Sequence, residues 1–515
     1  MSFTQNTDIS AQLNYLISTS TSGIVTIPAG NYIVNTSIDL LNKSNITLEG
    51  KGIGITTLKA TSELNGSDHV TKNNVINVNN LSIPHGSYPK NVTIRNMSID
   101  CSLQNPGGIP SNALYGYNLC GVEIQNVDNA VVDRVEVINA FGNGIVIASI
   151  DPLLSAAVIN PVITNCILDN VCRGILPQYG ITGSVIQVGA AKGGRVSNNH
   201  ITNSGAPWID AFNCYGVYFD QNYVEGINNT PFGPGQKKGA FHSDFGLDNC
   251  FITNNFMLNA GGIIINGNKT QGLFFTGGLP THSAYNCTVS GNKVVGHGTS
   301  PYTAPPVPNS NVEILTPDLP ILAILNGIAT VWINNVQQRL SGIGMRTFAI
   351  TPKSFLKVVY SDKPSWVWRV APNLFVPHYR LLGGSTSTIL GQACFNQITN
   401  NTSECAPSEA FACYDGFGND YKFNKVLNCG HSNGRGIAFA AYDSRTGAVG
   451  TGSKNNNYLG NTIFDTHDAS MLFMNFYSDS INNVNNSFKS NKLQVTMSGT
   501  ASVSSVANAL ITDNY

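Results

Sequence analysis

The sequence predicts an all-β solenoid, and two observations indicate this fold class. A short phrase recurs along the chain, with an apolar residue, two others, Asn, one other residue and again an apolar residue. Consecutive asparagines of this phrase lie 23 to 37 residues apart up to Asn292, and the full set is Asn165, Asn199, Asn222, Asn255, Asn292, Asn424 and Asn461. Charged residues are only 11% of the 515 residues, against about 25% in ordinary proteins. A near-constant period of strand-type apolar residues indicates short strands stacked in successive coils.

The N-terminal end of the chain predicts a cap on this stack. In residues 8–19, Leu13, Leu16 and Ile17 have helical spacing and follow a capping residue, Asp8. A short helix here would cover strand edges that the first coil otherwise exposes. The first strands are then expected within residues 23–32 and 45–52, where apolar alternation is bounded by Gly, Pro and Asn.

These first strands also carry a family resemblance. Residues 23–32 read GIVTIPAGNY and residues 45–52 read NITLEGKG. Both phrases are similar to the opening of proteins in the pectin-lyase-like right-handed parallel β-helix superfamily. The resemblance covers roughly residues 8–300 and 384–495. It implies a right-handed parallel β-helix, but it does not imply one reaction, because the superfamily includes lyases, hydrolases, epimerases and phage tailspikes.

The repeat is interrupted by a segment of different composition. A Pro-rich stretch begins at Pro301, and three of the four tryptophans follow it. Residues 357–368, KVVYSDKPSWVW, are similar to segments of bacteriophage tailspikes. We therefore expect a small inserted β module. The predicted organisation is an N-terminal cap at 1–22, a first part of the β-helix at 23–300, the inserted module at 301–383, a second part of the β-helix at 384–495 and a C-terminal strand or tail at 496–515.

Composition excludes several classes of partner and site. The net charge is −1 without a basic run, so nucleic acid and anionic membranes are not expected as partners. No apolar stretch approaches the roughly 18 residues of a membrane span, and the first residues show no secretory signal. The 11 cysteines have no metal-ligand spacing. We expect reduced, buried thiols, and we expect neither a metal nor another cofactor.

One strand aligned across four coils predicts the catalytic residues. The alignment places one apolar residue from each coil inward: Ile186, Ile209, Phe241 and Ile264. The next residue then faces outward, which forms a row of Gln187, Asp210 and His242. Asp244 lies two residues after His242 on the same face. It is therefore one coil and two residues away from Asp210, which corresponds to a separation of roughly 8 Å. This distance suits an inverting glycosidase, whose carboxyls lie roughly 6.5–9.5 Å apart.

In this interpretation Asp210 and Asp244 form an acid–base pair. One carboxyl protonates the leaving oxygen while the other activates water. His242 holds one carboxyl in its working state or contacts sugar hydroxyls. The alternative is a solvated Asp/His cluster on an exposed face. Glu225 and Asp248 are second-choice carboxylates.

Further residues are expected to contact the substrate. The loop 228–238 precedes the Asp244 strand, and its lysines would give a cleft a positive rim suited to an acidic polysaccharide; otherwise it is a solvated turn. A second row of tyrosines would stack on sugar rings, or it is an ordinary aromatic stack of a β-helix. The expected substrate-binding residues are Gln187, Trp208, Glu225, Lys237, Lys238, Asn266, Tyr414 and Tyr442.

The resemblance and the predicted site together favour a phage tailspike-type depolymerase. Such a protein cleaves glycosidic bonds of a bacterial capsule or O-antigen, and here hydrolysis is expected. The resemblance implies a homotrimer, located in the virion as part of the phage tail and acting at the bacterial surface. One alternative is a polysaccharide lyase acting on a uronic-acid glycan, with His242 or Tyr215 as base. The other is a fibre or adhesin that binds a glycan without cleaving it.

Overall fold

The protein was analysed as a computed structural model. It divides into two compact units, Met1–Tyr223 (unit 1) and Val224–Tyr515 (unit 2). The structure describes residues 3–21, 23–65, 74–79, 83–84, 86–102, 120–149, 156–172, 175–176, 180–181, 184–204, 209–225, 240–243, 246–258, 260–266, 284–296, 313–315, 327, 329–333, 336–339, 348–350, 356–360, 367–369, 379–382, 393–404, 406, 409–414, 416–427, 431–432, 435–442, 454–465, 471–476, 485–495, 502–503 and 510–512.

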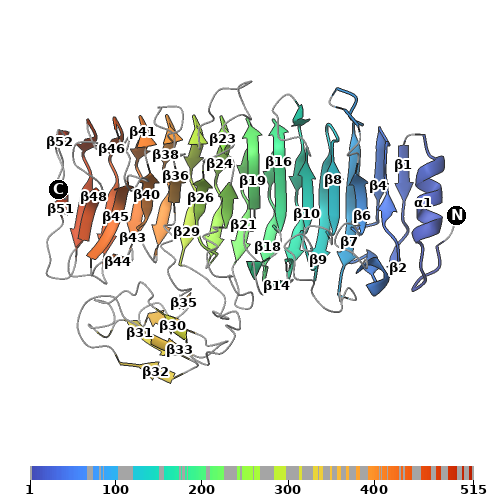
Figure 1. The fold of residues 1–515 in the computed structure, drawn as a ribbon, viewed down its shortest axis with the longest axis horizontal. Coiled ribbons are helices and arrows are strands. Elements are labelled where there is room, and N and C mark those ends of the chain that lie inside the picture. The colour runs from blue at the N-terminus through green and yellow to red at the C-terminus, as the bar shows by residue number, and fades with distance from the viewer. Residues whose placement is uncertain are drawn as a thin grey trace. The chain divides into compact units, whose positions relative to one another are not determined.

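Unit 1 consists mainly of parallel strands stacked coil upon coil (Figure 1), and β14 and β15 form a separate antiparallel pair. In sheet A of this unit a coil contributes either two short strands, such as β12 and β13, or one long strand, β7 or β9, and sheet B takes the strand that follows. Its elements are α1 (Ser10–Thr19), a 3-10 helix (Ser62–Asn65), β1 (Gly23–Thr26), β2 (Gly30–Val34), β3 (Ile38–Asp39), β4 (Ile46–Glu49), β5 (Thr56–Ala60), β6 (Ile76–Asn79), β7 (Val92–Asp100), β8 (Val122–Gln125), β9 (Val131–Ile138), β10 (Ile145–Ala148), β11 (Val158–Ile159), β12 (Val162–Thr164), β13 (Ile167–Asp169), β14 (Ile175–Leu176), β15 (Gly180–Ile181), β16 (Ile186–Lys192), β17 (Arg195–Ser197), β18 (His200–Thr202), β19 (Ile209–Tyr215) and β20 (Tyr218–Asp220).

Unit 2 repeats this arrangement, and β21 (Tyr223–Glu225) contains the boundary between the units. The strands of its sheet A are β24 (Phe251–Thr253), β25 (Phe256–Leu258), β28 (Thr288–Ser290), β29 (Lys293–Val295), β38 (Gln397–Thr399), β39 (Thr402–Glu404), β42 (Asp420–Lys422), β43 (Lys425–Leu427), β46 (Asn457–Leu459), β47 (Thr462–Asp465), β49 (Ser487–Lys489), β50 (Lys492–Val495) and β52 (Leu510–Thr512). The strands of its sheet B are β22 (Phe241–Ser243), β23 (Leu247–Asp248), β26 (Ile263–Asn266), β27 (Ala284–Tyr285), β36 (Tyr379–Leu382), β37 (Ala393–Cys394), β40 (Phe411–Tyr414), β41 (Gly416–Phe417), β44 (His431–Ser432), β45 (Arg435–Tyr442), β48 (Met471–Phe476) and β51 (Ser502–Val503). The predicted right-handed parallel β-helix is confirmed.

The predicted N-terminal helix is also present. α1 buries Leu13 and Ile17, which are 0% and 1% exposed. The Asp8 carboxylate Oδ1 accepts hydrogen bonds from the backbone N–H and the hydroxyl of Ser10, at 3.0 and 2.6 Å. This satisfies a donor that the first helical turn leaves without a partner. The helix therefore forms where the apolar spacing predicts it, while its N-cap is Ile9 and Asp8 contacts the first turn from one residue earlier.

The recurring asparagines form buried ladders along the stack. The Oδ1 of Asn222 accepts from the backbone N–H and the Nδ2 of Asn199, at 3.2 and 2.9 Å. The Nδ2 of Asn199 in turn donates to the carbonyl oxygen of Ile163. The same pattern continues in unit 2 through Asn255, Asn292, Asn401, Asn424, Asn461 and Asn491. Each amide thus satisfies backbone groups at a turn where ladder hydrogen bonds between strands are interrupted.

Asn165 belongs to the recurring phrase but not to this ladder. Ile163 pairs with Val196, so Asn165 is equivalent to Asn198, and the residue equivalent to Asn199 is Cys166. Asn165 and Asn198 have φ angles of 55° and 56°. Asn tolerates this left-handed turn conformation better than most residues. Two kinds of asparagine therefore stand next to each other in the phrase, one in the turn and one in the ladder.

Residues between β29 and β36 contain antiparallel strands of another kind (Figure 1). A four-stranded sheet has the order β32-β31-β34-β35, and β30 pairs with β33. The bounds are β30 (Glu313–Leu315), β31 (Ala329–Ile333), β32 (Val336–Gln338), β33 (Phe348–Ile350), β34 (Leu356–Tyr360) and β35 (Val367–Arg369). After them, β36 pairs in parallel with β26, Tyr379 opposite Ile263. The chain thus returns to the β-helix one coil further on. The boundaries of the inserted module at 301 and 383 stay a prediction.

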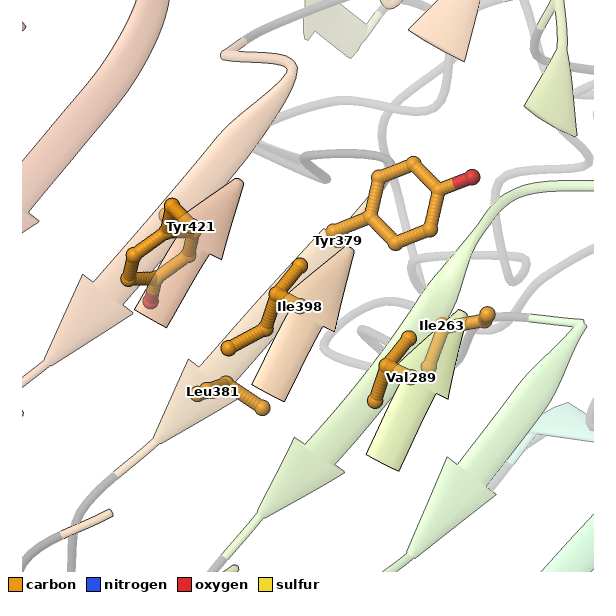
Figure 2. A pocket seen from close by; sticks show the side chains of 7 residues that line it. Ile263, Val289, Tyr379, Leu381, Ile398 and Tyr421 are labelled. Carbon is orange, nitrogen blue, oxygen red and sulfur yellow. The ribbon is translucent and has the colours of Figure 1, made fainter. Parts of the chain in front are cut away.

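The core of unit 2 is apolar and rich in aromatic side chains. Tyr379, Phe411 and Phe439 stack along one row, with ring centroids 4.6 and 5.0 Å apart. Figure 2 shows a small cavity beside Tyr379 and Tyr421, lined otherwise by aliphatic side chains. The lining is apolar apart from the two tyrosine hydroxyls. The nine cysteines that the structure describes are free and buried, as predicted for reduced thiols.

Candidate functional site

The register predicted for the first two coils of the candidate site is confirmed. β16 and β19 pair in parallel with Ile186 opposite Ile209 and Gln187 opposite Asp210. Ile186 and Ile209 are buried in the core. Because successive residues of a strand point to opposite faces, Gln187 and Asp210 lie next to each other on the outer face of sheet B.

Asp210 is held by neighbouring polar groups in unit 1. Its side chain is only 6% exposed. The hydroxyl of Ser184 and the amide of Gln187 donate to its Oδ2, at 3.2 and 3.4 Å. A buried carboxylate that accepts two side-chain hydrogen bonds on one oxygen has a fixed orientation.

His242 and Ser243 lie on β22 in unit 2, and both are buried, at 1% and 0% exposed. The alternative of a solvated cluster on an exposed face is therefore wrong for Asp210 and His242. The alignment of the fourth coil is also wrong by one residue, because Phe241 pairs with Ile263 and His242 with Ile264. Several consecutive isoleucines fit the core equally well, so apolarity alone does not define their register.

The remaining predicted residues are only partly described. Glu225 ends β21 and is half-buried. Asn266, Tyr414 and Tyr442 belong to β26, β40 and β45, and the structure describes their backbone. Outside the described residues are Asp244, Trp208, Lys237 and Lys238.

The tyrosine row has the predicted register. Tyr414 is opposite Tyr442, and Phe411 is opposite Phe439. On the next coil Met474 is opposite Phe439. The three strands therefore align as the sequence pattern predicts, and the role of the tyrosines in sugar binding stays a prediction.

Sequence reasoning missed a second buried carboxylate on the Asp210 row. Glu123 is 3% exposed and accepts hydrogen bonds from the amides of Asn74 and Gln125. The row passes from Glu123 through Val146 and Gln187 to Asp210. Three coils correspond to about 14 Å, which is too far for two carboxyls that share one glycosidic bond. The alternation Val122-Glu123-Ile124 was the available sequence signal.

Asp248 differs from the other carboxyls in its acidity. Burial raises the pKa of its carboxyl from 3.8 to about 6, while the amide of Asn249 donates to its Oδ1 at 2.7 Å. A carboxyl that is still partly protonated near neutral pH is suited to act as a general acid. In unit 2, Asp248 lies on β23 opposite Tyr285.

No group of three or more His, Cys, Asp or Glu side chains that could hold a metal occurs among the described residues. In the same part of the chain, none of the helices has the length and apolarity to cross a membrane.

Comparison with known families identifies the fold. Residues 2–147 match the profile of the family described as rhamnogalacturonase A/epimerase, pectate lyase-like. This part of the chain therefore resembles pectate lyase-like proteins, and both units fold as a parallel β-helix. No curated protein matches the chain.

Solved structures of similar topology have low sequence identity to the chain. The A-module of the mannuronan C-5 epimerase AlgE4 from Azotobacter vinelandii is 12% identical over 98% of this chain and 96% of its own, with a TM-score of 0.48. The catalytic domain of a GH87 α-1,3-glucanase in complex with nigerose is 10% identical over 96% and 68%, with a TM-score of 0.48. Tailspike protein 3 of bacteriophage CBA120 is 10% identical over 99% and 59%, with a TM-score of 0.45. At these values the similarity assigns no activity.

Proposed function

We propose that this pectate lyase-like protein is a tailspike-type depolymerase that hydrolyses glycosidic bonds of a bacterial surface polysaccharide. The observation that carries the proposal is the buried, oriented carboxylate of Asp210 on the outer face of sheet B in unit 1. A carboxylate whose orientation is held by neighbouring donors meets the geometric requirement for a reactive group.

Asp210 serves as one member of the acid–base pair, and Asp244 is the other member proposed from the sequence. One of the two groups, as a carboxylate, takes a proton from the attacking water. The other, as a carboxylic acid, gives a proton to the oxygen of the departing sugar. His242 orients one of the two carboxyls or a sugar hydroxyl. Glu225 and Asp248 are the second-choice carboxylates for this role.

Assembly as a homotrimer and a place in a phage tail belong to the same proposal. Light scattering on the purified chain would measure its mass in solution, and a mass of three chains is expected. A mass of one chain would contradict the homotrimer, but it would not contradict the proposed hydrolysis.

The experiment that tests the activity is incubation of the chain with purified capsular or O-antigen polysaccharides, followed by mass analysis of the fragments. Hydrolysis adds the mass of one water molecule for each bond that breaks. A lyase product instead contains a new double bond and absorbs ultraviolet light. If no polysaccharide is shortened by the wild-type chain, the depolymerase proposal fails and a glycan-binding fibre is the remaining function.

A further inference from the structure

An exposed phenylalanine on sheet A of unit 2 has an unusual backbone conformation. Phe423 is 58% exposed, and its φ angle is 56°. The same turn position on neighbouring coils is occupied by Asn400 and Gly460, which tolerate the left-handed region. A bulky residue there costs backbone free energy and leaves a large apolar ring in water. The geometry of the turn does not explain this choice.

The ring of Phe423 lies over the backbone of the next coil. A Cβ atom added to Gly460 would come within 2.7 Å of the Phe423 Cε1 atom. The absence of a side chain at Gly460 therefore lets the aromatic ring lie across the surface of sheet A. An aromatic ring lying across a surface offers a flat apolar area on which the C–H face of a sugar ring can pack.

Lysines flank this ring at a regular interval. On the Phe423 coil they are Lys422 and Lys425, and two coils further on they are Lys489 and Lys492. Since coils are about 4.8 Å apart, the two pairs are separated by about 10 Å. Lys293 continues the Lys425–Lys492 row two coils in the other direction.

Part of this positive charge has no carboxylate partner. Lys422 pairs with Asp420 at 2.8 Å, and Lys293 pairs with Glu404 at 3.5 Å. For the ammonium groups of Lys425, Lys489 and Lys492, the described part of the chain provides neither an ion pair nor a hydrogen bond. Lys425 and Lys492 are exposed, and Lys489 is half-buried.

We propose that the Phe423 face, formed by Phe423, Lys425, Lys489 and Lys492, binds an acidic polysaccharide. A sugar ring packs on Phe423 while carboxylates of sugars on either side meet Lys425 on one coil and Lys489 and Lys492 on the other. The interval between the lysines favours a glycan with a carboxylate on every second sugar. This binding does not depend on the proposed cleavage, because sheet A carries it and the candidate catalytic residues lie on sheet B.

Equilibrium binding of the full chain to hyaluronan, which has a carboxylate on every second sugar, tests the proposal, with neutral dextran as the comparison. Hyaluronan is expected to bind more tightly than dextran, and added salt is expected to weaken its binding because exposed charges are screened. The length of the polymer is measured before and after, so that cleavage and binding are scored separately.

Substitutions separate this site from a general charge effect. Phe423→Asn is expected to weaken hyaluronan binding about tenfold while the melting temperature stays the same or rises, since Asn suits the turn. Lys425→Gln with Lys492→Gln is expected to weaken binding about tenfold. The controls are Phe395→Asn, another exposed phenylalanine in a left-handed turn, and Lys90→Gln with Lys192→Gln. Both controls should bind like the wild type.

Two results would overturn the proposal. One is equal binding of hyaluronan and dextran by the wild type. The other is a change in the mass of the assembly in solution on Phe423→Asn substitution with no change in binding, since this would make the face a contact between copies of the chain.

Discussion

Asn292 and Asn401 are 109 residues apart in the sequence, yet they are consecutive members of one ladder. The Oδ1 of Asn401 accepts hydrogen bonds from the backbone N–H and the Nδ2 of Asn292, at 3.1 and 3.0 Å. The coil before the antiparallel strands therefore stacks directly on the coil after them. The stack does not need the intervening residues in order to continue.

Removal of the intervening segment should accordingly leave the β-helix folded. We expect a variant in which residues 297–377 are replaced by the short link of residues 259–262 to keep its circular dichroism spectrum and its cooperative unfolding. The reason is that β29 and β36 would be joined as β25 and β26 are joined one coil earlier. Insoluble or non-cooperative protein would show that the segment is part of the same folding unit.

The ladder amides should contribute strongly to stability. Asn292→Ala leaves the buried backbone N–H of Asn255 without the acceptor that it now meets at 3.0 Å. We expect a loss of about 3 kcal/mol in the free energy of unfolding, measured with denaturant. Asn455→Gly is the matched control at an exposed turn residue with a φ of 55°, and it should change the free energy by less than about 0.5 kcal/mol.

Two core tyrosines should respond in opposite ways to loss of the hydroxyl. The hydroxyl of Tyr379 donates to the carbonyl oxygens of Asn292 and Thr402, at 3.0 and 2.9 Å. The hydroxyl of Tyr421 is buried without a hydrogen-bond partner among the described residues. Tyr379→Phe should therefore lower the free energy of unfolding by about 1–2 kcal/mol, and Tyr421→Phe should leave it unchanged or raise it by about 1 kcal/mol. Equal losses in both variants would contradict this assignment.

Asp248 should make stability depend on pH. Burial raises the pKa of its carboxyl from 3.8 to about 6 in the folded protein, so folding favours the protonated form. This contribution is complete below pH 3.8 and is lost as the pH rises through about 6. Asp248→Asn should remove this loss of stability at high pH, so that the variant is more stable than the wild type at neutral pH. The difference should be only about 1 kcal/mol, because solvent screens the half-buried carboxyl. Denaturant midpoints that change with pH equally in both proteins would exclude this role.

The sequence predicted the fold well because its signals are local and repeated. Asp8 with Leu13 and Ile17 predicts the helix, and the phrases at 23–32 and 45–52 predict the first strands. The register of Gln187 and Asp210 followed because each coil offers one apolar residue to align. The predicted register was wrong by one residue at Ile264, where several consecutive isoleucines fit the core equally well. It was also wrong by one residue at Asn165, which is a turn asparagine next to the ladder position.

The candidate site was less predictable for a physical reason. The alternation of a strand shows which side chains leave the core, but it does not show whether other parts of the chain cover them. Asp210 and His242 face away from the core and are nevertheless buried. Glu123 was missed because the strand alignment that predicts Asp210 begins only at Val185, after the coil of Glu123. The Phe423 face was missed because its lysines are adjacent only after the coils stack.

The central claim is that Asp210 takes part in the cleavage of a polysaccharide, and the rate of fragment release by Asp210→Asn tests it most directly. The control is Asp39→Asn, which is on the same row of sheet B, about 24 Å away by coil spacing. We predict that Asp210→Asn reduces the rate by about 10²–10⁴-fold while Asp39→Asn retains the wild-type rate. Full activity of Asp210→Asn would contradict the account.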